Sequence, residues 1–272
     1  MLFGFEKINN EFYKIMCEPW EEGFANNFAK CYYSFSLTSL RLLLAIKDSI
    51  KRDERGIFRM CIENYRNGFM PTIEIPYSYA DIENYIIRRK LHESFKRGFE
   101  NSLEELKVQY VYRVKDKAGR KKEDVVSKFH PILNYKFNDE TETLKLTVPP
   151  ILVCLMSKDP SFLPYEIACK FGSIYSLRLA LMQTKENEKI QLSVDRWKDI
   201  LQIEGKYRLT KTFELNVFVA AKKELDLYAP YTFDYKTIFS YDKSNAPING
   251  IELMWHKNEN YNPSNINEQQ TI

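Results

Sequence analysis

A seven-residue string occurs twice in this chain, and the repeat limits the folds that the chain can adopt. "SLRLLLA" covers residues 39–45 and "SLRLALM" covers residues 176–182, and five of the seven positions are identical. Each copy follows a serine or threonine that can cap a helix, and each carries leucines at helical spacing. We therefore expect each copy to form the first helix of a similar small domain.

The segments that follow the two copies have the same predicted order. An extended piece, a helix, a basic break and a longer helix are expected at 71–79, 80–86, 87–90 and 91–106, and again at 189–193, 194–201, 204–208 and 209–225. Each half then continues into a β-hairpin, with strands at 108–114 and 125–137, and at 231–241 and 251–257. This order is the winged-helix plan, so the sequence predicts an α+β protein with two tandem winged-helix domains that arose by duplication. Chance similarity between two leucine-rich helices is the alternative.

The length and composition agree with two folded domains. The chain has 272 residues, of which 44% are apolar, and its 18 Tyr and 18 Phe are far too many for a disordered chain. We predict an N-terminal domain at 1–158, a C-terminal domain at 159–257 and a flexible tail at 258–272. The tail is rich in Asn and Gln, so its removal after Lys257 is expected to leave the thermal stability nearly unchanged.

Cysteine usage and hydropathy favour a reduced cytosolic protein. The five cysteines form no CxxC pair, and the first residues lack the layout of a signal peptide. The longest apolar run, "VPPILVCLM" from Val148, is far shorter than the roughly 20 residues that cross a bilayer. We therefore expect no membrane contact.

The positive charges cluster where a helix-turn-helix protein would contact DNA. The net charge is only +3, so an anion-binding surface has to come from local clusters. The second helix of such a unit lies in the major groove, and basic residues around it contact phosphates. In the first half, the candidate DNA-binding residues at the break, the helix start and the wing turn are Arg88, Arg89, Lys90, Lys96, Arg97, Lys115, Lys117, Arg120, Lys121 and Lys122. In the second half, they are Lys206, Tyr207, Arg208, Lys211, Thr212 and Asn216. For each cluster, the alternative is a solvated surface without a partner.

The sequence contains no recognisable catalytic or cofactor motif. The three histidines form neither HxH nor HExxH, and neither GxxxxGK[ST] nor GxGxxG occurs. Tyr207 could act as a nucleophile only beside an activating metal cluster, which the sequence does not provide. We therefore expect no enzymatic activity, no metal site and no cofactor.

Several of these segments resemble the replication initiator (Rep) proteins of iteron-containing plasmids. They are "YSFSLTSLRLLLA" from Tyr33, "IYSLRLALM" from Ile174, "KYRLTKTF" from Lys206 and "AAKKEL" from Ala220, and the resemblance extends over about residues 28–257. "FLPYEIACKFGSIYSLRL" from Phe162 resembles the junction between the two domains of that family.

The resemblance implies a prokaryotic, cytoplasmic protein that binds directly repeated DNA at a plasmid origin. The C-terminal domain is then expected to read bases, and the N-terminal domain to contact the DNA backbone and form a dimer. Monomers would help to melt the origin and recruit the host replicative helicase and host initiator, while dimers would repress the initiator's own gene. The family usually has basic residues where this chain has Glu214, Leu215 and Asn216. This departure moves the expected base contacts toward residues 206–212, although Asn216 could pair with an adenine edge and Leu215 with a thymine methyl.

Two other functions agree with the same pattern. A transcriptional regulator could use the same modules, but the sequence shows no separate effector domain. A protein-interaction scaffold could keep the fold without binding DNA, but the basic stretch 113–122 argues against it because protein interfaces are depleted in lysine.

Overall fold

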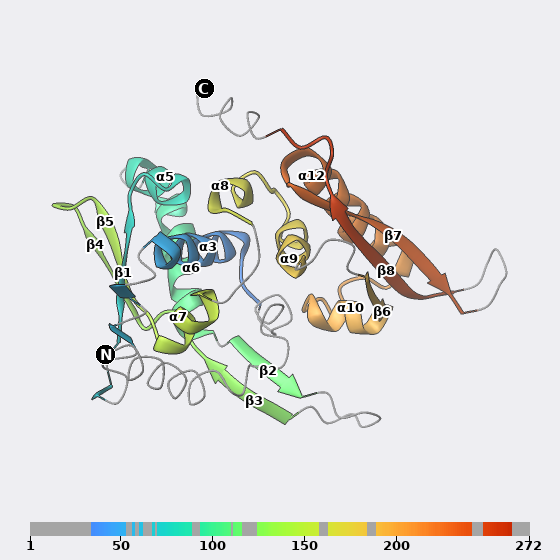
Figure 1. The fold of residues 1–272 in the computed structure, drawn as a ribbon, viewed down its shortest axis with the longest axis horizontal. Helices are drawn as coiled ribbons and strands as arrows, with labels where there is room; N and C mark the ends of the chain where they lie inside the picture. Colours follow the sequence, from blue (N-terminus) through green and yellow to red (C-terminus); the bar gives the residue numbers. More distant parts are fainter. Residues whose placement is uncertain are drawn as a thin grey trace, which may run out of the picture. The chain divides into compact units, whose positions relative to one another are not determined.

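The computed structural model divides the chain into two compact units, Met1–Asp159 and Pro160–Ile272, and each is described by itself (Figure 1). The described residues are 34–52, 56–57, 60–61, 67–68, 70–88, 93–109, 111–115, 124–157, 163–183, 189–240 and 247–262. Among them, no sheet takes strands from both units.

The first unit consists of helices around a three-stranded sheet, with a separate hairpin. Its elements are α3 (Leu37–Arg52), β1 (Thr72–Pro76), α5 (Ala80–Arg88), α6 (Glu93–Val108), β2 (Val111–Lys115), β3 (Asp124–Phe129), β4 (Asn134–Asn138), β5 (Thr143–Thr147) and α7 (Pro150–Ser157). The sheet is antiparallel, in the order β1-β5-β4, and β2 pairs only with β3. The Tyr85 ring stacks on Phe99 and Phe137, with centroids 4.6 and 4.9 Å away, and so joins α5, α6 and β4.

The second unit repeats this plan. Its elements are α8 (Tyr165–Ala168), α9 (Ile174–Met182), β6 (Lys189–Ser193), α10 (Val194–Ile200), α11 (Thr210–Glu214), η4 (Leu215–Val219), α12 (Ala220–Tyr228), β7 (Tyr231–Phe239) and β8 (Ile248–Lys257). The sheet order is β6-β8-β7, and Trp197 joins α10 to the sheet by donating its indole N–H to the Ile251 carbonyl at 2.9 Å.

The two units share one topology, and the predicted fold class is confirmed. In the first unit, β5 is the central strand and pairs with β1 and β4. In the second unit, β8 is the central strand and pairs with β6 and β7. The repeated strings lie in α3 and α9, the first helix of each winged-helix plan. A helix, a strand, two further helices and a hairpin therefore occur twice, as the duplication hypothesis requires.

The same glutamate contact also occurs twice. Ser36 precedes α3, and its backbone N–H donates to the Glu105 carboxylate of α6 at 2.7 Å. Ser173 is the N-cap of α9, and its N–H donates to the Glu224 carboxylate of α12 at 3.3 Å. Glu224 also accepts from the Gly172 N–H at 3.2 Å. Helix N-termini have unpaired N–H groups and a partial positive charge, so both carboxylates stabilise the start of the first helix.

We expect Glu224→Gln to lower the free energy of unfolding of the second unit by about 1 kcal/mol, because the amide keeps the shape but loses the charge of the acceptor. Urea unfolding followed by tryptophan fluorescence measures this loss, since Trp197 and Trp255 are both buried in this unit. Glu204→Gln, at an exposed position in the turn between α10 and α11, is the control and should leave the unfolding midpoint unchanged. Equal midpoints for the Glu224 variant and the wild type would contradict the role of this contact.

The arginine of the repeated string links the first helix to the second in both units. Arg41 pairs with Asp81 of α5, with 3.4 Å between the charged atoms. Arg178 is buried and donates to the carbonyls of Ile200 and Leu201, at the C-terminal end of α10. The shared arginine therefore has a packing role in each half.

The first wing lies elsewhere than the sequence indicated. The strands expected at 108–114 and 125–137 were assigned to one hairpin, but the β2–β3 hairpin is separate from the three-stranded sheet. By its place in that sheet, the wing of the first unit is β4–β5. Its turn is acidic, because Asp139, Glu140 and Glu142 are all exposed there. The basic segment thus belongs to an additional hairpin, β2–β3. In the sequence, this hairpin lies between α6 and the wing β4–β5.

The folded part of the second unit extends past the predicted boundary at 257. Asn258 is buried, and its side-chain NH₂ lies 3.2, 2.9 and 2.9 Å from the carbonyl oxygens of Leu225, Asp226 and Ala229, so its two hydrogens are shared among three acceptors. These carbonyls lie at the C-terminal end of α12, where a helix leaves its last carbonyls unpaired, although that of Leu225 also accepts from the Ala229 N–H at 2.9 Å. The expectation that the tail from Asn258 lies outside the core is therefore wrong for its first residue. Residues 263–272 of the predicted tail lie outside the described residues.

Candidate DNA-binding surface

The turn before α11 is shaped by two residues with left-handed backbone. Gln202 and Gly205 have φ angles of 54° and 74°, which reverse the chain between α10 and α11. Lys198 of α10 then holds the end of the turn, because its ammonium donates to the Tyr207 carbonyl at 2.9 Å. The start of α11 is therefore fixed to α10, as a helix-turn-helix requires.

Two of the predicted site residues, Lys206 and Tyr207, make contacts with other residues of the unit, although Lys206 is exposed. The Lys206 ammonium donates to the Tyr175 hydroxyl of α9 at 2.7 Å and lies 5.3 Å from the centre of that ring. Tyr207 is half-buried, and its burial, followed by its hydrogen bond with Tyr175, raises its pKa to about 12. Both side chains therefore help to fix the turn.

The other predicted residues of this half lie on the surface. Arg208, Lys211, Thr212 and Asn216 are all exposed, at the end of the turn and on the first two turns of the helix. Asn216 donates its side-chain amide to the Thr212 carbonyl at 2.8 Å, which fixes the orientation of the amide. Lys206 is exposed as well, so the structure places five of the six candidates on the surface at one end of the unit.

A π-turn inside the helix aligns its faces. We call Thr210–Tyr228 the recognition helix; it consists of α11, η4 and α12, and η4 is a π-helical turn. The buried residues Phe213, Val217, Ala221 and Leu225 follow each other at four-residue steps. The three steps from Phe213 to Leu225 are about one residue longer than three turns of an α-helix. In a regular α-helix, Leu225 would therefore be rotated away from the core. The wider π-turn, with its hydrogen bonds to the fifth residue back, takes up that extra residue.

The π-turn also aligns the opposite face. Lys211, Leu215, Val219 and Lys223 have the same four-residue spacing, and we call these four residues the outer stripe. Lys211, Leu215 and Lys223 are exposed, and Val219 is half-buried. Sequence reasoning placed Leu215 and Val219 on the outer side of the helix, but it missed their alignment with Lys211 and Lys223, although the four-residue spacing contained the signal for it.

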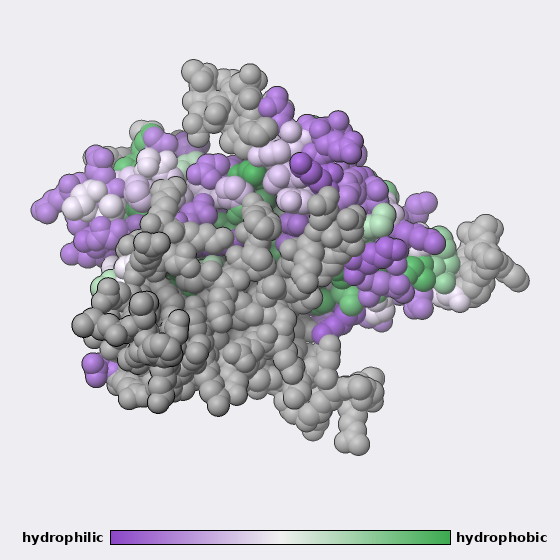
Figure 2. Space-filling model, in the orientation of Figure 1, coloured by the Kyte–Doolittle hydropathy of each residue, from purple (hydrophilic) through white to green (hydrophobic). Residues whose placement is uncertain are grey.

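The wing of the second unit runs back along the recognition helix. Near the C-terminal end of that helix, Thr232 of β7 donates to Asp226, and nearer the N-terminal end, the Tyr235 ring lies 6.3 Å from the Phe218 ring. The far end of the hairpin thus points toward the end of the helix that carries Arg208 and Lys211. Figure 2 shows apolar residues toward the far end of this hairpin, and β7 ends there at Phe239, which is 48% exposed.

In the first unit, three of the predicted cations have described side chains. Arg88 ends α5 and is exposed, and Lys96 is half-buried in the first turns of α6. Arg97 is exposed and pairs with Glu93 one turn earlier, with 3.6 Å between the charged atoms. Lys115 is the last residue of β2. The other predicted cations of this half lie outside the described residues: Arg89, Lys90, Lys117, Arg120, Lys121 and Lys122.

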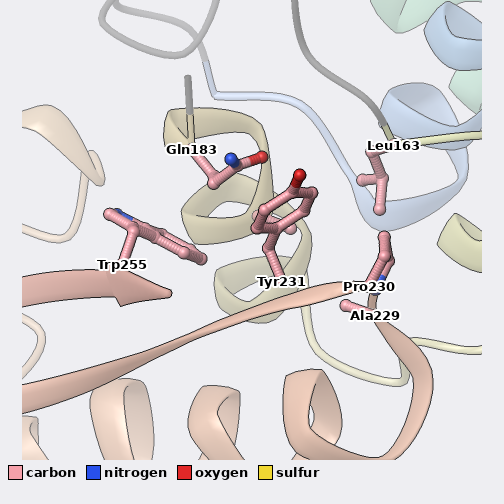
Figure 3. Close-up of a pocket in the computed structure, with 7 residues that line it drawn as sticks. Leu163, Gln183, Ala229, Pro230, Tyr231 and Trp255 are labelled. Atoms are coloured by element: carbon pink, nitrogen blue, oxygen red, sulfur yellow. The ribbon is translucent and has the colours of Figure 1, made fainter. Parts of the chain in front are cut away.

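The described residues of the second unit contain a small pocket near the start of β7 (Figure 3). Gln183, Tyr231 and Trp255 line it, and it has room for about one water molecule. A cofactor does not fit there. The part of the chain that the structure describes contains no group of three metal-ligating side chains. It also has no helix that is long and apolar enough to cross a membrane.

The order of elements and the β6-β8-β7 sheet define the second unit as a winged-helix domain. Residues 193–255, which span most of this unit, match the family model described as "Initiator Rep protein, WH2". The resemblance that the sequence showed to replication initiator proteins is confirmed for this segment.

Two solved structures are similar to this chain. One is the Pi initiator protein in complex with iteron DNA, with 15% identity, a TM-score of 0.44, and coverage of 70% of this chain and 82% of that one. The other contains domains 2 and 3 of RctB, with 10% identity, a TM-score of 0.47 and coverage of 82% of each chain. No curated protein sequence matches the chain.

Proposed function

We propose that this protein initiates plasmid replication by binding double-stranded DNA at directly repeated sites in an origin. The observation that carries the proposal is the match of residues 193–255 to the winged-helix domain of initiator Rep proteins. This segment contains the recognition helix, β7 and β8 up to Trp255. In this proposal, the second unit reads bases and the first unit contacts the DNA backbone.

The charge distribution of the second unit supports DNA as the partner. Arg208 and Lys211 are exposed at the end of the helix toward which the wing points. Glu204 is the one exposed acid between residues 201 and 212. A cationic end on a helix of this kind favours phosphates at the edge of the major groove.

Further steps of the proposal rest on the resemblance to Rep proteins. The protein would act in the cytoplasm of a prokaryote and without enzymatic activity. As a monomer, it would help to melt the origin and recruit the host replicative helicase and host initiator. As a dimer formed through the first unit, it would repress its own gene.

We expect the full-length protein to bind a duplex with tandem direct repeats from the DNA beside its gene, and to prefer this duplex to random DNA. Arg208→Ala should lower the affinity for the repeats about tenfold and lower the affinity for random DNA less, because a base contact is worth roughly 1 to 3 kcal/mol of discrimination. Lys257→Ala is the control: Lys257 is also exposed, but it lies at the base of the wing. Competition binding at fixed salt measures the ratio of the two affinities.

Replication itself needs a second readout, because a transcriptional regulator would give the same binding result. A circle of DNA that carries only this gene, its flanking repeats and a selectable marker should be maintained in a host when the protein is wild type. It should be lost with Arg208→Ala. Specific binding without maintenance of the circle would favour the regulator.

A further inference from the structure

The outer stripe of the recognition helix is positively charged at its two ends and apolar in its middle. Lys211 and Lys223 lie twelve residues apart, about 18 Å along a helix axis. The major groove is about 12 Å wide, so two lysines at this separation can reach phosphates on both sides of it. The middle of the stripe, Leu215 and Val219, then faces the base edges.

The middle of the recognition helix lacks the side chains that read guanine. Arginine and lysine make the usual bidentate contact with guanine. Residues 212–221 contain no arginine or lysine, and Lys222, which follows them, is half-buried. The Lys222 ammonium lies 3.2 Å from the Asp226 carboxylate and 3.5 Å from the Asp234 carboxylate. Lys222 is therefore neutralised inside the unit.

Glu214 would be the side chain in this region to accept from cytosine, but it is engaged elsewhere. It is half-buried, and it interacts with Tyr235 of the wing. Burial, and then the nearby charge of Glu214 and its hydrogen bond, raise the pKa of Tyr235. The carboxylate is thereby kept at the wing side of the helix.

Leu215 presents an apolar group where polar side chains are the rule. It is 51% exposed, although the unit buries most of its other leucines. The apolar group that the major groove offers is the C5-methyl of thymine. Contact between the two removes apolar surface from water on both sides.

Asn216 has the hydrogen-bonding groups that adenine requires. One hydrogen of its amide is used by the Thr212 carbonyl. The second amide hydrogen and the amide oxygen remain for a partner outside the helix. Adenine offers the matching pair in the major groove, an acceptor at N7 and a donor at N6.

We propose that the middle of the recognition helix selects A·T base pairs, with Leu215 against a thymine methyl and Asn216 against an adjacent adenine edge. The inference rests on the proposed function and specifies the class of DNA that the site takes. The exposed leucine could instead be a docking point for another protein, and the experiment below separates the two.

The test uses single-atom changes in the DNA together with the full-length protein. Selection from random duplexes at fixed salt first gives the preferred site. Replacing thymine by uracil removes only the methyl group, and should weaken wild-type binding about fourfold at one position, as expected for one buried methyl. The same change should have no effect on Leu215→Ala. Replacing adenine by 7-deazaadenine removes the N7 acceptor and should weaken wild-type binding about tenfold, but not binding of Asn216→Ala.

Leu227→Ala is the matched control, because Leu227 is 62% exposed but lies at the opposite end of the recognition helix. It should respond to uracil and 7-deazaadenine as the wild type does. The inference is wrong if uracil weakens DNA binding by the wild type and by Leu215→Ala equally. It is also wrong if the selected site has G·C pairs and neither variant alters the preference for them. In both cases the proposed function stands. If selection yields no preferred duplex, both are wrong.

Discussion

Asn258→Ala is expected to lower the free energy of unfolding of the second unit by about 2 kcal/mol, that is, about 1 kcal/mol each for the Asp226 and Ala229 carbonyls, which lose their donor, while the Leu225 carbonyl keeps the Ala229 N–H. The three carbonyls belong to the last turn of α12 and to Ala229, and two of these contacts are fully buried. Water cannot replace the amide without opening the junction between α12 and β7. Urea unfolding monitored by tryptophan fluorescence measures the loss.

The control and a truncation pair make this prediction specific. Asn260→Ala changes an exposed residue of the same turn that takes part only through its backbone N–H, so the unfolding midpoint should not move. A chain that ends after Asn262 should keep the stability of the full chain, whereas one that ends after Lys257 should lose as much as Asn258→Ala. Wild-type stability in the shorter chain would show that the amide is dispensable.

Gly250→Ala is expected to lower the free energy of unfolding of the second unit by about 3 kcal/mol, through overpacking. A Cβ at Gly250 would lie 2.8 Å from the backbone oxygen of Leu192 on β6. β8 is the central strand and is also paired with β7, so it cannot move aside. The same unfolding measurement gives the effect.

Gly98→Ala is the opposite case and serves as the control. Gly98 is exposed in α6, and a Cβ there meets no atom within 4 Å. Alanine should therefore raise the stability of the first unit by roughly 0.5 to 1 kcal/mol, because it loses less conformational freedom on folding. If both substitutions destabilise alike, the contact with Leu192 is not the cause of the effect at Gly250.

Local patterns in the sequence were sufficient for most of the second unit. The strand at 189–193 and the helix at 194–201 were predicted within one residue, because alternation and capping are set by neighbours in the chain. The recognition helix was also found, but its π-turn was not. The signal was available: four-residue steps from Phe213 to Leu225 cannot stay on one side of a regular α-helix.

The errors concern contacts between residues far apart in the chain. The segment 134–147 is a hairpin with an Asn-Asp turn, but only its pairing with β1, about 70 residues earlier, makes it the wing. Nothing near Asn258 shows that its amide caps a helix that ends 30 residues before it. The DNA-contacting roles of the basic clusters remain predictions, because charge alone does not distinguish a phosphate site from a solvated surface.

In the recognition helix, the proposed DNA contacts and the contact with α9 lie on separate segments. The residues that we propose to read bases, Leu215 and Asn216, lie at the start of the π-turn, whereas Glu224, which holds the start of α9, lies beyond the π-turn. An exchange of residues 208–219 with those of another initiator would therefore leave the anchor intact, while an exchange that continues through Glu224 would remove it. If the proposed function holds, the binding preference can thus diverge by substitution of outward-facing residues such as Leu215 and Asn216, while the buried Phe213, Val217 and Phe218 and the Glu224 contact stay unchanged.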